Sequence, residues 1–118
     1  MLSLTVNYNG ESQTLHYTFT HDVVVEKRGK VPRHVTRCFG CTDEVFKEHP
    51  KPSKEWSNGI SCTAPEDFFR YNRKFGNQLA FWRMLRKLYP VDRNIRKAFM
   101  MEYINKHGLP VKRNFVTN

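Results

Sequence analysis

The chain of 118 residues contains no long apolar run. A membrane-spanning helix needs about 20 consecutive residues of mainly apolar character, and no segment meets that requirement. The stretch 2–6 is too short, and too interrupted by polar residues, to form the apolar part of a signal peptide. We therefore expect a protein without a membrane partner that works in the cytoplasm.

Familiar catalytic motifs are also missing. The sequence has no Gly-rich phosphate-binding loop, no His-Glu-x-x-His pair and no Gly-x-Ser-x-Gly elbow. Its paired acids are sequence neighbours, Asp43-Glu44 and Glu66-Asp67, which loop solubility and helix capping explain, and its five histidines are scattered. These absences favour a protein that is not an enzyme, and a metal-dependent enzyme with an open coordination position is the remaining alternative.

Acidic residues are scarce. The chain has 11 Asp and Glu against 20 Lys and Arg, a net charge of +9. Between residues 68 and 118 there are twelve basic residues and only two acids, Asp92 and Glu102. Such a field attracts acidic protein surfaces or nucleic acid. We expect a partner of one of these kinds.

The three cysteines cannot all pair with one another, and cytoplasmic thiols usually stay reduced. Residues three apart in a straight strand face opposite sides, so joint use of Cys38 and Cys41 requires a turn at Gly40. A structural zinc ion takes four Cys or His ligands. The predicted set is Cys38, Cys41, His49 and Cys62, with His34 as the other choice for the fourth ligand. The competing interpretation is that the cysteines are small core residues without a metal.

The first half of the chain has the pattern of strands. Residues 2–8 and 15–19 alternate apolar and polar side chains around Asn9-Gly10, which predicts a β-hairpin. Residues 23–26 form a β-branched run, and residues 31–41 and 59–62 read as further extended segments. Residues 43–58 are polar and contain two prolines, which predicts a loop or a short helix.

The second half has the pattern of helices. Thr63 and Glu66 form a capping box with Pro65 in the first turn, which predicts the start of a long helix. Its expected apolar face consists of Phe68, Tyr71, Phe75, Leu79, Trp82, Leu85 and Leu88. Asp92 is the predicted cap of a second helix that ends at Gly108.

These patterns predict one α+β domain over residues 1–108. Residues 1–62 are expected to form an antiparallel sheet of four or five strands, and residues 64–107 a helical hairpin packed on one face of it. Residues 109–118 are expected to form a basic tail. Basic side chains on the two helices are the predicted partner-binding residues: Arg70, Arg73, Lys74, Arg83, Lys87, Arg93, Arg96 and Lys97. The ordinary alternative is a solvated helix face.

Two stretches resemble a pattern in small, uncharacterised bacteriophage accessory proteins. They are Gly59-Ile60-x-Cys62-x-x-Pro65-Glu66-Asp67-x-Phe69 and Gly76-x-x-Leu79-Ala80-x-x-Arg83. The phage pattern is G-[IV]-A-x-C-x-P-x-D-x-F followed by G-x-x-[LI]-A-x-x-R, and this chain departs from it by one residue between the cysteine and the proline.

The resemblance implies a phage or mobile-element accessory protein, of the anti-defence or anti-CRISPR type, that acts in the cytoplasm of a host cell. Proteins of this kind bind and block host machinery, CRISPR–Cas effectors included, and the resemblance supplies no catalytic residues. The leading hypothesis is a non-enzymatic inhibitor or modulator of a host protein or nucleoprotein complex, with or without a structural zinc. Direct nucleic-acid binding is the alternative.

Overall fold

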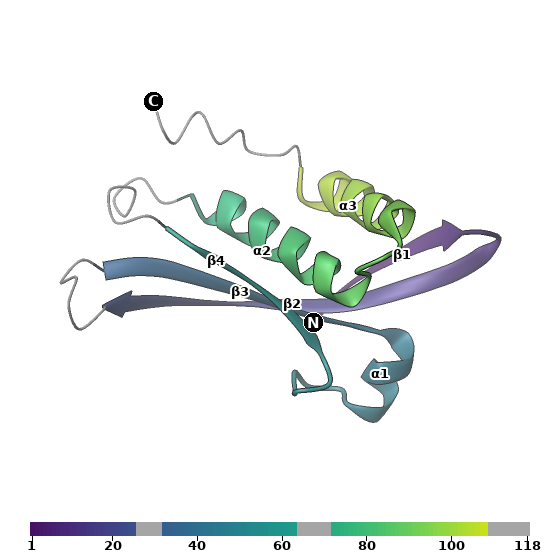
Figure 1. Ribbon diagram of the computed structural model, residues 1–118, viewed down its shortest axis with the longest axis horizontal. Coiled ribbons are helices and arrows are strands. Elements are labelled where there is room, and N and C mark those ends of the chain that lie inside the picture. Colours follow the sequence, from purple (N-terminus) through teal and green to yellow (C-terminus); the bar gives the residue numbers. More distant parts are fainter. Residues whose placement is uncertain (26–31, 64–71, 109–118) are drawn as a thin grey trace.

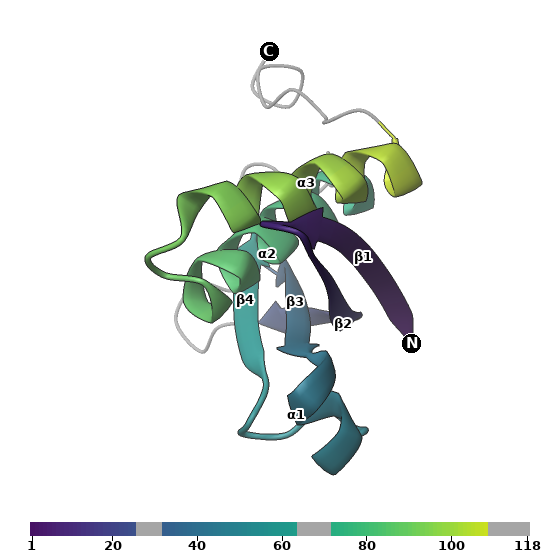
Figure 2. The ribbon, with the colours of Figure 1, turned by 90° about the vertical axis from the view of Figure 1, so that its right-hand side faces the viewer.

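The computed structural model describes residues 1–25, 32–63 and 72–108. Four strands form one antiparallel sheet in the order β1-β2-β3-β4: β1 (Leu2–Tyr8), β2 (Glu11–Val25), β3 (Pro32–Thr42) and β4 (Ser57–Cys62). Three helices accompany them: α1 (Asp43–Glu48), α2 (Arg73–Leu88) and α3 (Arg93–His107). Helices α2 and α3 cover one face of the sheet, and α1 lies below the other (Figures 1 and 2). The predicted α+β class, with helices on one face of an antiparallel sheet, is confirmed.

The first hairpin turns at Asn9-Gly10, as predicted. Both residues adopt positive φ, 51° at Asn9 and 79° at Gly10, and such values match the twist of a two-residue hairpin. Strand β2 then continues without a break to Val25. The β-branched run after residue 22 therefore belongs to β2, and the described sheet has four strands.

Helix α2 begins later than predicted. Its N-cap is Asn72, in an extended conformation, and the Asn72 side chain accepts a hydrogen bond from Phe75 N. Thr63 instead continues the pairing of β3 with β4, because its N–H donates to the His34 carbonyl and its Oγ1 accepts from His34 N. A single helix from Thr63 to Leu88 was therefore the wrong expectation. The rest of the predicted capping box, Pro65 and Glu66, lies outside the described residues, as do Phe68 and Tyr71.

Helix α3 has the predicted ends. Asp92 Oδ1 accepts hydrogen bonds from Asn94 N and Ile95 N, and it also accepts one from the Tyr8 hydroxyl at 2.9 Å. Gly108 closes the helix with φ of 100°, and its N–H donates to Ile104 O. The Asp92 carboxylate thus both caps α3 and ties it to β1. The predicted tail, residues 109–118, lies outside the described residues. Within the described ranges, no helix combines the length and apolar character needed to cross a membrane.

The face of α2 that meets the sheet differs from the predicted one. Its buried residues are Gly76, Ala80, Phe81, Met84 and Leu85. Of the expected stripe residues that the structure describes, only Leu85 is therefore fully buried. The physical reason lies in the sheet, since Gly59 of β4 presses against the backbone of α2 at Ala80 and Met84. Small residues on the helix permit this approach, and the bulkier expected residues are left half-buried on its flank.

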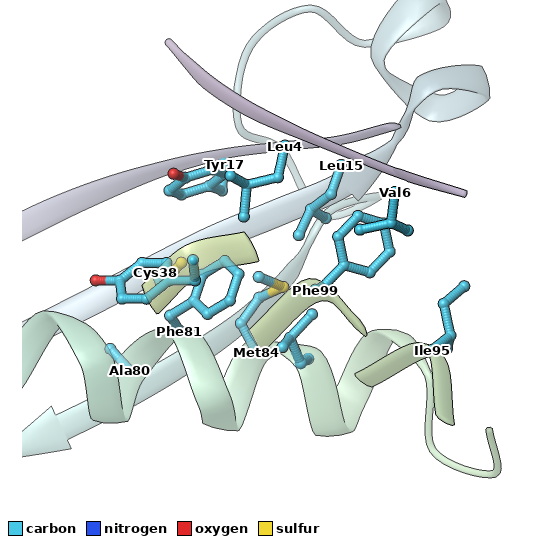
Figure 3. Close-up of a cluster of buried hydrophobic side chains, with 12 residues drawn as sticks. Leu4, Val6, Leu15, Tyr17, Cys38, Ala80, Phe81, Met84, Ile95 and Phe99 are labelled. Atoms are coloured by element: carbon cyan, nitrogen blue, oxygen red, sulfur yellow. The ribbon is translucent and has the colours of Figure 1, made fainter. Parts of the chain in front are cut away.

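An aromatic cluster fills the space between the sheet and the helices (Figure 3). Phe81 stacks on Tyr103 with ring centroids 4.2 Å apart and meets Tyr17 edge-to-face at 5.1 Å. The Tyr17 hydroxyl forms a 2.8 Å hydrogen bond with His107 Nε2. Burial raises the pKa of Tyr17 to about 12, and burial, with Lys106 and Lys74 nearby, lowers the pKa of His107. The bond therefore joins two neutral groups near pH 7 and fastens the end of α3 to β2.

Candidate functional site

The two cysteines of β3 point to opposite faces of the sheet. Cys38 lies opposite Gly59 on the face covered by α2 and is completely buried in the core. Cys41 lies opposite His16 on the other face and is also buried. Strand β3 runs straight through Gly40, which pairs with Tyr17. The turn that joint metal binding required is therefore not formed.

The other predicted zinc ligands lie apart from this pair. Cys62 is exposed and lies opposite Val35, on the same side of the sheet as Cys41. His49 ends α1, and its carbonyl accepts a hydrogen bond from Trp56 Nε1. The alternative ligand, His34, contacts His21 on the helix side, with His21 Nε2 3.0 Å from His34 Nδ1.

The structure therefore does not bring Cys38, Cys41, His49 and Cys62 together. Within the ranges described, no group of three or more Cys, His, Asp or Glu side chains is placed to hold a metal ion. Zinc binding by this set stays a prediction, and it would require Cys38 to leave the core.

A His–Asp pair lies beside Cys41, on the face away from α2. His16 Nε2 is 2.9 Å from Asp43 Oδ1, and the His16 ring stacks on Phe46 at 3.9 Å. A cysteine nucleophile needs a lowered pKa, whereas burial and the Asp43 charge raise the pKa of Cys41 to about 11. Cys41 therefore remains a neutral thiol near pH 7, which favours a packing role for it.

The exposure of the thiols gives a direct test. We expect an aromatic disulfide reagent at pH 8 to modify Cys62 in the folded protein, because its side chain is exposed. Cys38 and Cys41 should react only on unfolding, since burial excludes the reagent and raises their pKa values. Absorbance of the released thiol measures the number of reactive groups. The Cys62→Ser variant is the control and should lose the fast phase; two fast-reacting thiols in the wild type would contradict this assignment.

The predicted basic residues occupy three regions of the helical layer. Arg73 and Lys74 are exposed in the first turn of α2, and Arg70 lies outside the described residues. Arg83 and Lys87 lie near β4, where Arg83 Nη1 donates to Ile60 O at 2.7 Å and Lys87 Nζ approaches Asn58 Oδ1 at 3.5 Å. The third region is α3, which carries the exposed Arg93 and Lys97.

Arg86 was not among the predicted partner-binding residues. It is exposed on the same turn of α2 as Arg83 and Lys87, and residues three or four apart are neighbours on a helix. Arg83, Arg86 and Lys87 thus form a compact group, here called the α2 basic cluster. The sequence did contain a signal for this group, because Arg86 follows Arg83 by three residues on a predicted helix.

Arg96 is a structural residue. Its Nη1 donates to the carbonyls of Tyr89 at 3.1 Å and Pro90 at 3.2 Å, so the guanidinium holds the connection between α2 and α3. The side chain is half-buried. Arg96 is therefore a poor candidate for contact with a partner, although it was predicted as one.

The charge of the helical layer is almost unopposed. Residues 72–108 contain nine Lys and Arg but only two acids, Asp92 and Glu102. The Asp92 carboxylate already accepts hydrogen bonds from the Tyr8 hydroxyl and from Asn94 N in the first turn of α3. The ion pairs recorded among the described residues all involve Asp22 or Asp43, away from this layer. The outer side of α2 and α3 is therefore a surface of positive charge without ion-pair partners in the part of the chain described.

Comparisons of this chain with protein-family models, with curated proteins and with solved structures found no match.

Proposed function

We propose that this protein is a non-enzymatic binding protein that inhibits or modulates a host protein or nucleoprotein complex. The single observation that supports this most is the positive charge of α2 and α3, which has no ion-pair partners among the described residues. Folded chains tolerate such a charged surface, but it destabilises them through self-repulsion. A partner with acidic groups relieves that repulsion on docking.

The proposed contact surface combines the α2 basic cluster with the exposed bases of α3. Arg residues supply forked hydrogen bonds to carboxylates or phosphates and are frequent in interface hot spots. Half-buried Trp82 and Leu79 belong to the same helix. They supply apolar area within a basic surround, which is the usual composition of an interface.

The phage-like segment, residues 59–83, suggests the biological setting. Within this proposal, the chain is a bacteriophage accessory protein that acts in the host cytoplasm, and a CRISPR–Cas effector is one candidate target. Such effectors carry nucleic acid and therefore offer phosphate groups to a basic surface.

Charge reversal tests this proposal. The Arg86→Glu/Lys87→Glu variant should bind at least about tenfold more weakly to partners captured from bacterial host lysate, because like charges then face each other across the interface. Quantitative mass spectrometry of the captured proteins measures the loss. The matched control is Lys51→Glu/Lys54→Glu, with the same change of net charge at exposed positions on the α1 side. Equal capture by the two variants and the wild type would contradict the proposal.

Nuclease treatment of the lysate separates a protein partner from nucleic acid. Capture that survives treatment supports a protein contact. Capture that disappears, together with a gel shift on plain DNA that weakens steeply with salt, instead identifies direct nucleic-acid binding.

A further inference from the structure

Strand β2 is much longer than the strand beside it. Strand β1 pairs with residues 11–17 of β2, and its last pair is Leu2 with Tyr17. Residues 18–25 of β2 pair with β3 on one side and with no described strand on the other, as Figure 1 shows at the end of the β2–β3 ribbon. Every second residue of such an edge directs its N–H and C=O groups outward, where an added strand can bind them.

The two outer strands of the sheet, β1 and β4, are each protected by a basic side chain, unlike residues 18–25 of β2. On β4, Arg83 Nη1 occupies the Ile60 carbonyl at 2.7 Å, and on β1, Lys106 Nζ occupies the Ser3 carbonyl at 3.1 Å. Long basic side chains at an edge are a recognised means of preventing strand addition. Residues 18–25 contain no Lys or Arg, so this edge lacks such protection from its own side chains.

The side chains of this edge favour association. Val23, Val24 and Val25 are 52%, 41% and 62% exposed, and alternation along the strand places them on both faces of the ribbon. The only acid, Asp22, is 3.7 Å from Arg37 Nη1. In a chain of net charge +9, this is therefore a segment of low charge, high β-propensity and exposed apolar area.

We propose that a second copy of this chain pairs with residues 18–24 through the same residues, antiparallel and about a two-fold axis. The two sheets then join into one continuous sheet across the β2 edges. An identical strand fits because the same edge in each copy supplies the outward donors and acceptors that the other needs. The low charge of the segment makes it the place where two strongly basic molecules approach with little repulsion. The β2 edge belongs to the sheet, whereas the basic surface lies on helices α2 and α3. The proposed dimer therefore does not depend on the proposed function.

The pattern of side chains selects one register. An axis perpendicular to the sheet keeps the helices of both copies on one side, which requires residues of the same face to lie opposite each other. A register centred on Asp22 would place two carboxylates directly opposite, which is unfavourable. Centring on His21 instead pairs Phe19 with Val23, Thr18 with Val24 and Thr20 with Asp22. Aromatic–β-branched pairs of this kind stabilise antiparallel strands. The pairing ends at Val24, because Tyr17, which would face Val25, already pairs with Leu2 of β1.

The expected dimer is weak, because seven paired residues on each copy form less than a standard interface of about 1,600 Å². We expect a dissociation constant on the order of micromolar. Sedimentation velocity over a concentration series should show a shift from the monomer mass of 14.0 kDa towards twice that value. Hydrogen exchange read by mass spectrometry should show protection of residues 18–24 that rises with protein concentration.

The test variant is Val23→Lys/Val24→Lys, which adds one charge to each face of the edge at exposed positions. It should weaken association at least about tenfold by like-charge repulsion across the pair. The matched control is Asn7→Lys/Asn105→Lys, with the same added charge at exposed positions on β1 and α3, and it should associate as the wild type does. Circular dichroism checks that both variants fold.

Three results would overturn the proposal. The first is a wild type that stays monomeric throughout the series. The second is a dimer that the Val23→Lys/Val24→Lys variant forms equally well. The third is protection of residues 18–24 that is the same at every concentration, because the edge is then covered by other residues of the same chain.

Discussion

A Gly59→Ala variant is expected to lose about 3 kcal/mol or more of its free energy of unfolding. A Cβ atom at this position would overlap the Ala80 carbonyl oxygen and the Met84 backbone nitrogen of α2. Backbone atoms within a hydrogen-bonded helix cannot rotate away, so α2 would have to move off the sheet as a whole. Overpacking of a dense core typically costs about 1–3 kcal/mol, and sometimes more, and the high end applies where the obstacle is rigid.

Gly40→Ala is the matched control for this prediction. Gly40 lies on the neighbouring strand and faces the same helix, but a Cβ there would meet the side-chain sulfur and terminal methyl of Met84. Methionine is flexible and can adopt another rotamer, so we expect a loss of only about 1 kcal/mol. Urea denaturation followed by circular dichroism measures both values. Equal losses for the two variants would show that α2 does not lie against the backbone of β4.

A Phe81→Ala variant is expected to lose about 3–5 kcal/mol of unfolding free energy. The Phe81 side chain is completely buried and contacts both Tyr103, by stacking, and Tyr17, edge-to-face. Removing it leaves a cavity between β2, α2 and α3 and removes two aromatic contacts. Domains of this size are stable by about 5–15 kcal/mol, so the loss approaches the whole stability of a marginal domain.

Phe75→Ala is the control, because it deletes the same side chain from the same helix. Phe75 is only half-buried, so the expected loss is about 1–2 kcal/mol, in proportion to the smaller buried area. Thermal and urea unfolding of the two variants measure the difference. A larger loss for Phe75→Ala would mean that α2 presents to the sheet the face expected from its apolar spacing, in place of the one described here.

The parts of the fold that depend on local chemistry were predictable from the sequence. The turn at Asn9-Gly10 follows from the tolerance of both residues for positive φ, which they adopt. The start of α3 at Asp92 and its end at Gly108 follow from a side chain that caps free N–H groups and a residue that accepts φ of 100°. Alternation of apolar residues in β1 and β2 also specified which face is buried. In each case a few adjacent residues are sufficient to determine the local structure.

Only the tertiary structure decided the features that depend on residues far apart in the chain. Helix α2 is apolar around much of its circumference, and Gly59 of β4 decides which stripe meets the sheet. Cys38 and Cys41 are separated because β3 is held straight by its pairing with β2 and β4. The Arg96 guanidinium donates a hydrogen bond to the Tyr89 carbonyl at the end of α2, whereas the Arg86 side chain remains exposed. Sequence spacing gives the direction of a side chain within its own element, but contact depends on which element packs beside it, and that is a property of the folded chain.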